Sequence, residues 1–287
     1  MGFSSLNEIL VAVEEAGSYA KAVLLDDARE NGITESQSKA KMVTLWKAMK
    51  DSLTEYDPQQ KSNSGMVGGD GAKMKELVAK KKNVTGDFVG SVISAALSVA
   101  ECNACMKRIV AAPTAGSCGV LPAVLVTYEQ FYGATDEQML DALYVAAGIG
   151  QVIATRAYIA GATGGCQAEI GAASAMAAGA LTALRGGDAK MINSAAAMAL
   201  KNLLGLVCDP VGGLVEVPCV KRNVVGAVNA LSACDMAMAG ISSNIEPDDV
   251  VDAMKEVGDK MNPAFKETGE GALAATNSAK RLLKNQR

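Results

Sequence analysis

Small side chains, above all alanine and glycine, fill the long apolar segments of this 287-residue chain. Alanine is the strongest helix former, and helices lined with small side chains can pack closely together. A β-sandwich would need more valine, isoleucine, threonine and aromatic residues, and aromatic residues make up only 4% of this chain. No segment alternates convincingly between apolar and polar residues. The sequence therefore predicts an all-α fold, a bundle of small-residue-rich helices joined by glycine-rich loops.

Helical signals divide the single subunit, residues 1–287, into three regions. Residues 1–56 carry two capping boxes, Ser5 to Glu8 and Thr34 to Gln37, and are expected to form an N-terminal helical hairpin. Residues 57–73 are polar and glycine-rich and are expected to form a loop. Residues 74–287 are expected to form the core. Its predicted helices cover residues 87–112, 135–159, 171–184, 189–206, 224–239 and 247–260.

The chain contains no histidine, which is the commonest metal ligand and the commonest general base. Any metal must therefore be bound by thiolates or carboxylates. Cys166 lies in Gly161-Ala-Thr-Gly-Gly-Cys-Gln-Ala-Glu169, and a second segment runs Cys208-Asp-Pro-Val-Gly-Gly-Leu-Val-Glu-Val-Pro-Cys219. Glycine lets backbone N–H groups approach sulfur closely, and such hydrogen bonds help to tune iron–sulfur centres. These segments suggest a metallocluster site, although their spacing alone leaves ligation and simple burial equally open.

The remaining cysteines favour other interpretations. Cys102, Cys105 and Cys234 lie in apolar helical stretches, where a free cysteine packs as a small hydrophobe. Cys118 follows Pro113-Thr-Ala-Gly-Ser117, a loop whose backbone N–H groups could face a small anion. The loop with Ser62, Ser64 and Gly68-Gly69-Asp70 allows the same interpretation. For both loops, local sequence alone favours an ordinary turn.

Charge and hydropathy exclude two classes of partner. The formal net charge is −4 and the pI is about 5.1, whereas nucleic-acid-binding surfaces are normally basic. No apolar run is long enough to span a bilayer, and no signal peptide follows Met1. We therefore expect no nucleic-acid or membrane partner and a cytoplasmic location, where cysteines stay reduced or bind metal.

Three of these motifs, taken together, resemble a known family. Pro113-Thr-Ala-Gly-Ser117, Thr163-Gly-Gly-Cys-Gln-Ala-Glu169 and the Cys208–Cys219 segment, in this order, closely resemble the alpha chain of iron–sulfur-dependent L-serine dehydratases. The Ser62-Asn-Ser-Gly65 loop is also similar, and the resemblance extends from about Lys61 to the end. It implies that Cys166, Cys208 and Cys219 bind a [4Fe–4S] cluster by three thiolates. The fourth iron would then be open to substrate.

The resemblance also implies an activity, the conversion of L-serine to pyruvate and ammonia in amino-acid degradation. Ser62, Ser64, Gly65, Thr114 and Ser117 are the expected substrate-binding residues. The chain has neither a beta-like domain nor a C-terminal cysteine tail, which matches the two-chain type and implies a separate beta chain. Without histidine, the general base is expected from that beta chain. Lys61 and Lys73, and also Glu169, remain internal candidates.

Two other functions stay open on the sequence. An L-cysteine desulfidase of the same superfamily would use a similar cluster to expel sulfide instead of hydroxide. A non-catalytic iron–sulfur sensor or scaffold subunit would bind the cluster without turning over any substrate. The hydroxyl-bearing Pro113–Ser117 loop favours an enzyme over a sensor.

Overall fold

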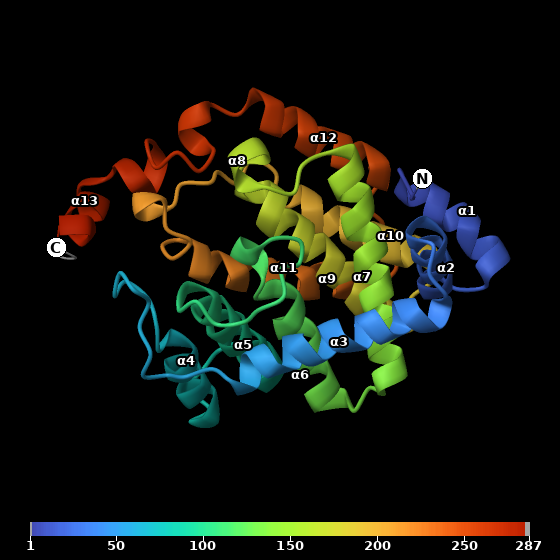
Figure 1. The fold of residues 1–287 in the computed structure, drawn as a ribbon, viewed down its shortest axis with the longest axis horizontal. Coiled ribbons are helices and arrows are strands. Elements are labelled where there is room, and N and C mark those ends of the chain that lie inside the picture. Colours follow the sequence, from blue (N-terminus) through green and yellow to red (C-terminus); the bar gives the residue numbers. More distant parts are fainter. Residues whose placement is uncertain (1, 285–287) are drawn as a thin grey trace.

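The computed structural model describes residues 2–284, and in that range the all-α prediction is confirmed (Figure 1). These residues form α-helices and no β-strand. The helices are α1 (Leu6–Ala16), α2 (Tyr19–Asn31), α3 (Glu35–Thr54), α4 (Asp70–Ala79), α5 (Gly86–Ala104), α6 (Val120–Tyr132), α7 (Asp136–Arg156), α8 (Gly161–Gly164), α9 (Ala172–Leu184), α10 (Ala189–Lys201), α11 (Cys219–Met238), α12 (Pro247–Lys260) and α13 (Asn277–Lys284).

Helix α9 forms the centre of the bundle and packs against α6, α7, α10 and α11. It is rich in alanine and is buried along nearly its whole length. Its Gly179 is packed so closely against α7 that an added Cβ would collide with Cδ1 of Ile149. The small side chains that favour helix formation thus also set the short distance between these helices.

The N-terminal region contains three helices where the sequence predicted a hairpin of two. Gly17 ends α1 and Ser18 caps α2, so a segment with continuous helical spacing is broken in the middle. The Thr34–Gln37 capping box is present at α3. At α1, Ser5 caps the backbone N–H of Glu8, but the Glu8 carboxylate accepts hydrogen bonds from Ser4. Local periodicity detected the helices but missed this turn.

The predicted 57–73 loop is shorter than expected, because α4 begins at Asp70. The cap comes from a distant residue. The carboxylate of Glu101 on α5, which is almost fully buried, accepts the N–H groups of Asp70 at 2.9 Å and Gly71 at 3.3 Å. Tyr56 also donates to this carboxylate at 2.6 Å. Glu101 therefore fixes the C-terminal end of the loop that carries Ser62 and Ser64.

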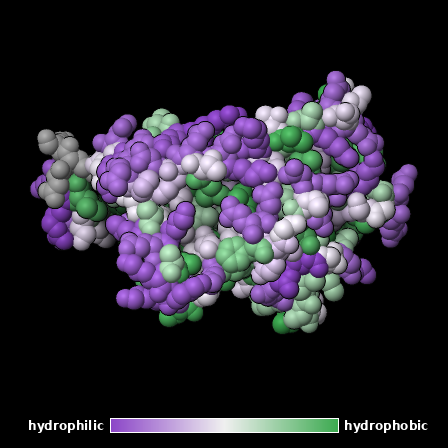
Figure 2. Space-filling model, turned by 90° about the horizontal axis from the view of Figure 1, so that it is seen from below, coloured by the Kyte–Doolittle hydropathy of each residue, from purple (hydrophilic) through white to green (hydrophobic). Residues whose placement is uncertain are grey.

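Helices α1 and α2 lie at one end of the long axis, and α13 lies at the other (Figure 1). Seen from below, the surface is largely hydrophilic, with hydrophobic residues scattered between hydrophilic ones (Figure 2). Within residues 2–284, no helix is both long and apolar enough to cross a membrane.

Truncating Ile149 should test the close packing between α7 and α9. Ile149 is fully buried, and Gly179 opposite has no side chain to fill a cavity. Ile149→Ala should therefore lower the free energy of unfolding by about 2–5 kcal/mol, measured by urea denaturation. Val84 is fully exposed, so Val84→Ala should change it by less than about 0.5 kcal/mol. Equal effects of the two substitutions would contradict this account of the core.

Candidate functional site

Three segments bring Cys166, Cys208 and Cys219 into one region. Cys166 lies between α8 and a π-helical turn (η2, Gln167–Gly171), Cys208 lies in the connection after α10, and Cys219 is the first residue of α11. All three are buried. Burial raises the pKa of Cys166 and of Cys219 to about 12, and it also raises the pKa of Cys208. Each of the three thiols lies close enough to another for its charge to contribute to these shifts.

A cation, Arg222, lies one helical turn after Cys219. Its charge opposes the rise in the pKa of the Cys166 thiol. Its guanidinium also donates to the carbonyl of Val207 at 2.8 Å. A second nitrogen lies 2.7 Å from Oδ1 of the buried Asp209, an ion pair whose angle falls outside hydrogen-bond geometry. Arg222 is thus placed to offset negative charge on the thiols.

The C-terminal segment fixes the backbone at Cys208. The N–H of Cys208 donates to the carbonyl of Phe265 at 2.7 Å, and the N–H of Glu267 donates to the carbonyl of Cys208 at 2.8 Å. Oδ2 of Asp209 accepts the N–H of Leu273 at 2.9 Å. Figure 1 shows this segment, in red, beside the connection that leads to α11. Residues far apart in the sequence therefore position this thiol.

Two buried amide side chains hold the surrounding loops together. Nε2 of Gln167 donates to the carbonyls of Gly164 and Met254 at 2.9 and 3.0 Å, and its Oε1 accepts the N–H of Gly205 at 2.8 Å. Asn223 on α11 donates to the carbonyl of Gly116 at 2.8 Å and accepts the N–H of Gly119 at 2.9 Å. Each amide joins a cysteine segment to a neighbouring loop.

Thr114 contacts the first cysteine segment directly. Its Oγ1 donates to Oε1 of Glu169, in the π-helical turn, at 2.7 Å. Burial raises the pKa of Glu169, and the Thr114 hydrogen bond offsets part of that rise. Ser117 is fully buried, and its Oγ lies 3.2 Å from Oγ1 of Thr114. Thr114 therefore faces the site, while Ser117 stabilises the turn that presents it.

Ser62 and Ser64 contact the second cysteine segment in a similar way. Both hydroxyls donate to the same oxygen, Oε2, of Glu216, and the Ser62 bond measures 2.7 Å. Glu216 is almost fully buried and lies between Cys208 and Cys219 in the sequence. Gly65 closes the turn, with its N–H donating to the carbonyl of Ser62 at 2.8 Å. The structure therefore joins both hydroxyl loops to the cysteine segments.

The two candidate lysines lie differently. Nζ of Lys61 donates to the carbonyl of Gly68 within its own loop. Lys73 lies on the exposed side of α4 and forms an ion pair with Asp70 at 2.8 Å, which raises the lysine pKa. A raised pKa keeps the amine protonated and disfavours a role as base. Within residues 2–284, neither amine forms a hydrogen bond or ion pair with a cysteine segment.

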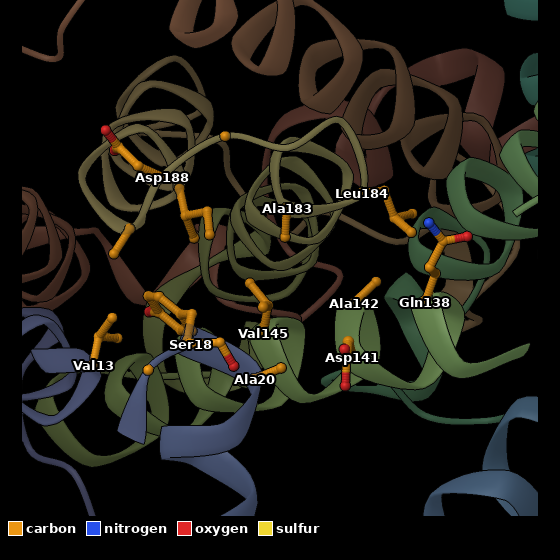
Figure 3. A pocket seen from close by; sticks show the side chains of 15 residues that line it. Val13, Ser18, Ala20, Gln138, Asp141, Ala142, Val145, Ala183, Leu184 and Asp188 are labelled. Carbon is orange, nitrogen blue, oxygen red and sulfur yellow. The ribbon is translucent and has the colours of Figure 1, made fainter. Parts of the chain in front are cut away.

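A cavity of about 410 Å³ lies elsewhere (Figure 3). It is lined by the α1–α2 turn, α7 and the α9–α10 connection, and it includes Gln138, Asp141 and Asp188. The cavity lies at the C-terminal end of α9, where Ala183 and Leu184 line it. The turn that carries Glu169 lies at the N-terminal end of α9, about 20 Å away along the helix. The cavity contains none of the predicted site residues. We place the candidate site at the thiols because titratable groups converge there.

Comparison with known proteins shows to which family the chain belongs. A model of the family described as serine dehydratase alpha chain matches residues 7–274. The chain belongs to the serine dehydratase alpha chain family. The match covers all the motifs described above, from the Ser62 loop to Cys219.

Three relatives illustrate the family. A probable L-serine dehydratase alpha chain of Bacillus subtilis (strain 168) is 48% identical over 78% of this chain and 74% of its own length. The L-serine dehydratase alpha chain of Peptoniphilus asaccharolyticus is 38% identical over 98% of this chain and 97% of its own. An L-serine dehydratase of Escherichia coli (strain K12) is 45% identical over 62% of this chain but only 40% of its own length.

Sequence reasoning missed several residues that organise the site. Arg222 and Asn223 were not predicted, and Gln167 and Glu216 were noted only as parts of motifs. One signal was present: Arg222 and Asn223 are polar residues one turn after Cys219, at the start of an otherwise apolar helix. Their partners, however, lie in other segments and can be identified only in the folded chain.

The raised thiol pKa values make a prediction about reactivity. The thiolate is the form that reacts with iodoacetamide, and a pKa of about 12 leaves little thiolate at pH 8. In the metal-free native chain, Cys166, Cys208 and Cys219 should each be alkylated more than about tenfold slower than in the urea-unfolded chain. Peptide mass spectrometry would measure each rate. Equal rates in both states would show that burial does not control these thiols.

Proposed function

We propose that this chain is the alpha chain of an L-serine dehydratase, which converts L-serine to pyruvate and ammonia. The observation that carries the proposal is the convergence of both hydroxyl loops on the segments that hold the three thiols. The names of the relatives support the substrate and the reaction. The reaction removes the α-proton and the β-hydroxyl of serine as water. The aminoacrylate that remains then rearranges and is hydrolysed to pyruvate and ammonia.

The proposed cofactor is a [4Fe–4S] cluster held by Cys166, Cys208 and Cys219. The residues fit such a group, since three buried thiols come from separate segments and Arg222 lies beside them. In the described part of the chain, no three Cys, Asp or Glu side chains are placed to share one metal ion. In a cluster each thiolate binds a different iron, so the sulfurs need not converge on one point. Three thiolates leave one iron without a protein ligand, which supplies Lewis-acid chemistry for a leaving hydroxyl.

The loops with Ser62, Ser64 and Gly65, and with Thr114 and Ser117, are the proposed substrate-binding elements. Backbone N–H groups of these turns offer donors for a carboxylate. The hydroxyls of Ser62, Ser64 and Thr114 already donate to Glu216 and Glu169, so their first effect is to position these carboxylates. Ser117 supports its loop from the inside.

The proposed general base comes from a beta chain. The chain has no histidine, and Lys61 and Lys73 each hydrogen-bond an oxygen of their own loop or helix. The alpha-chain names of the relatives imply a beta chain as partner. In such a complex this chain would supply the thiols and the substrate loops, and the partner would supply the base. A cytoplasmic location fits a metabolic enzyme with reduced thiols.

Anaerobic turnover measurements test the proposed function. The full chain together with a beta chain should release pyruvate from L-serine, whereas the chain alone should be slower by about 10²–10⁴-fold, the usual contribution of a positioned base. Full activity of the chain alone would contradict the assignment of the base. Release of sulfide from L-cysteine in preference to pyruvate from L-serine would favour a desulfidase. Absence of any turnover by the complex would favour a sensor or scaffold.

Cysteine substitutions test the ligand set. Replacing Cys166, Cys208 or Cys219 with alanine should abolish cluster absorbance and greatly lower the iron content of anaerobically purified protein, because each removes one of three protein ligands. Cys234→Ala is the matched control, since Cys234 is equally buried but lies near the C-terminal end of α11, about four turns from Cys219. It should keep the iron of the unmodified protein. Full iron in Cys208→Ala would overturn the ligand assignment.

A further inference from the structure

Glu169 is a carboxylate of the candidate site that has one oxygen without a hydrogen-bond donor in the described residues. Its Oε1 accepts the Thr114 hydroxyl at 2.7 Å, whereas no residue in the range 2–284 donates to its Oε2. No lysine or arginine of that range forms an ion pair with it. Arg222, the cation of the site, is engaged by Asp209 and by the carbonyl of Val207. The side chain of Glu169 is partly exposed, so a ligand can reach it.

The surroundings of Glu169 are negative. Another negative charge, that of Glu267, acts on Glu169. Gly161 shows how close Glu169 lies to Cys208. A Cβ at that position would be 2.8 Å from Oε2 of Glu169 and 2.7 Å from Sγ of Cys208. A partly buried carboxylate beside a second carboxylate is unfavourable unless a cation joins it.

Glu216 differs from Glu169 in its hydrogen bonds and its burial. Its Oε2 accepts two hydroxyls, from Ser62 and Ser64, and its side chain is almost fully buried. Its hydrogen bonds serve to join the serine loop to the second cysteine segment. Each glutamate has one oxygen that accepts no donor within residues 2–284, but Glu216 accepts two hydroxyls and is almost fully buried, whereas Glu169 accepts one and is partly exposed.

We propose that Glu169 binds the α-ammonium group of the amino-acid substrate, with Thr114 positioning its carboxylate. This rests on the proposed function, because the one positively charged group of L-serine is the ammonium, and it is bonded to the carbon next to the one that bears the leaving hydroxyl. A carboxylate beside the thiols would hold that ammonium and so direct the hydroxyl toward the thiols. Glu169 would thereby select amino acids over hydroxy acids and simple carboxylates.

A matched pair of unreactive ligands tests this assignment. L-Alanine and propionate differ only in the ammonium group, and neither carries a hydroxyl that can leave. Dissociation constants would be measured by ligand-observed NMR on the anaerobically prepared full chain with a beta chain. Glu169→Gln should weaken L-alanine binding by about 10–100-fold, the usual cost of losing a charged hydrogen bond. The same substitution should change propionate binding by less than about threefold.

Two further variants complete the test. Glu256→Gln is the control. It removes an exposed carboxylate that pairs with Lys260, and it should leave both dissociation constants unchanged. Thr114→Val should weaken L-alanine more than propionate, and it decides the question if Glu169→Gln does not fold. Equal weakening of both ligands would show a merely structural role and overturn the inference. Unchanged L-alanine binding with a loss of serine turnover would also overturn it and would assign Glu169 to proton transfer.

The outcomes separate this inference from the proposed function. If the unmodified complex binds L-alanine through Glu169 but releases no pyruvate from L-serine, the ammonium site stands and the dehydratase assignment falls. If the complex turns over L-serine and Glu169→Gln weakens both ligands equally, the dehydratase stands and the ammonium site falls. If the unmodified complex binds neither ligand, both are overturned.

Discussion

The site depends on hydrogen bonds between loop hydroxyls and two glutamates of the cysteine segments. Thr114 donates to Glu169, three residues after Cys166, and Ser62 and Ser64 donate to Glu216, three residues before Cys219. Hydrogen bonds to a charged acceptor are about twice as strong as neutral ones, and partial burial strengthens them further. Loops that lie 50 to 150 residues away in the sequence are thereby fixed beside the thiols.

The site carries more negative than positive charge. The negative or potentially negative groups are the three thiols, Glu169 and Glu267. The positive group, Arg222, forms an ion pair with Asp209. In the metal-free chain the thiols remain protonated because burial disfavours their charged form. Thiolates would therefore form there when a metal group takes up their charge. The same imbalance makes a positively charged ligand favourable next to Glu169.

Close packing between α9 and α11 holds the segments that carry Glu169 and Cys219. The π-helical turn with Glu169 runs directly into α9, the most buried helix, and α11 begins at Cys219 and packs against α9. Gln167 and Asn223 join these helix starts to the adjoining loops with fully paired amide groups. Buried polar groups that find all their partners fix one arrangement of the loops, because any other would leave them unpaired. The helix bundle therefore positions the glycine-rich segments.

The sequence by itself determined the helical class, most helices and the motifs of the site. Alanine-rich periodicity and local signals such as the Thr34 and Thr135 caps are properties of neighbouring residues, so they can be identified without a fold. The resemblance also pointed to Cys166, Cys208 and Cys219. Only the tertiary structure decided that Glu101 starts α4 at Asp70, that the hydroxyls of Ser62 and Thr114 face glutamates, and that Arg222 lies beside a thiol. These contacts join residues far apart in the chain, and their partners depend on how the helices pack.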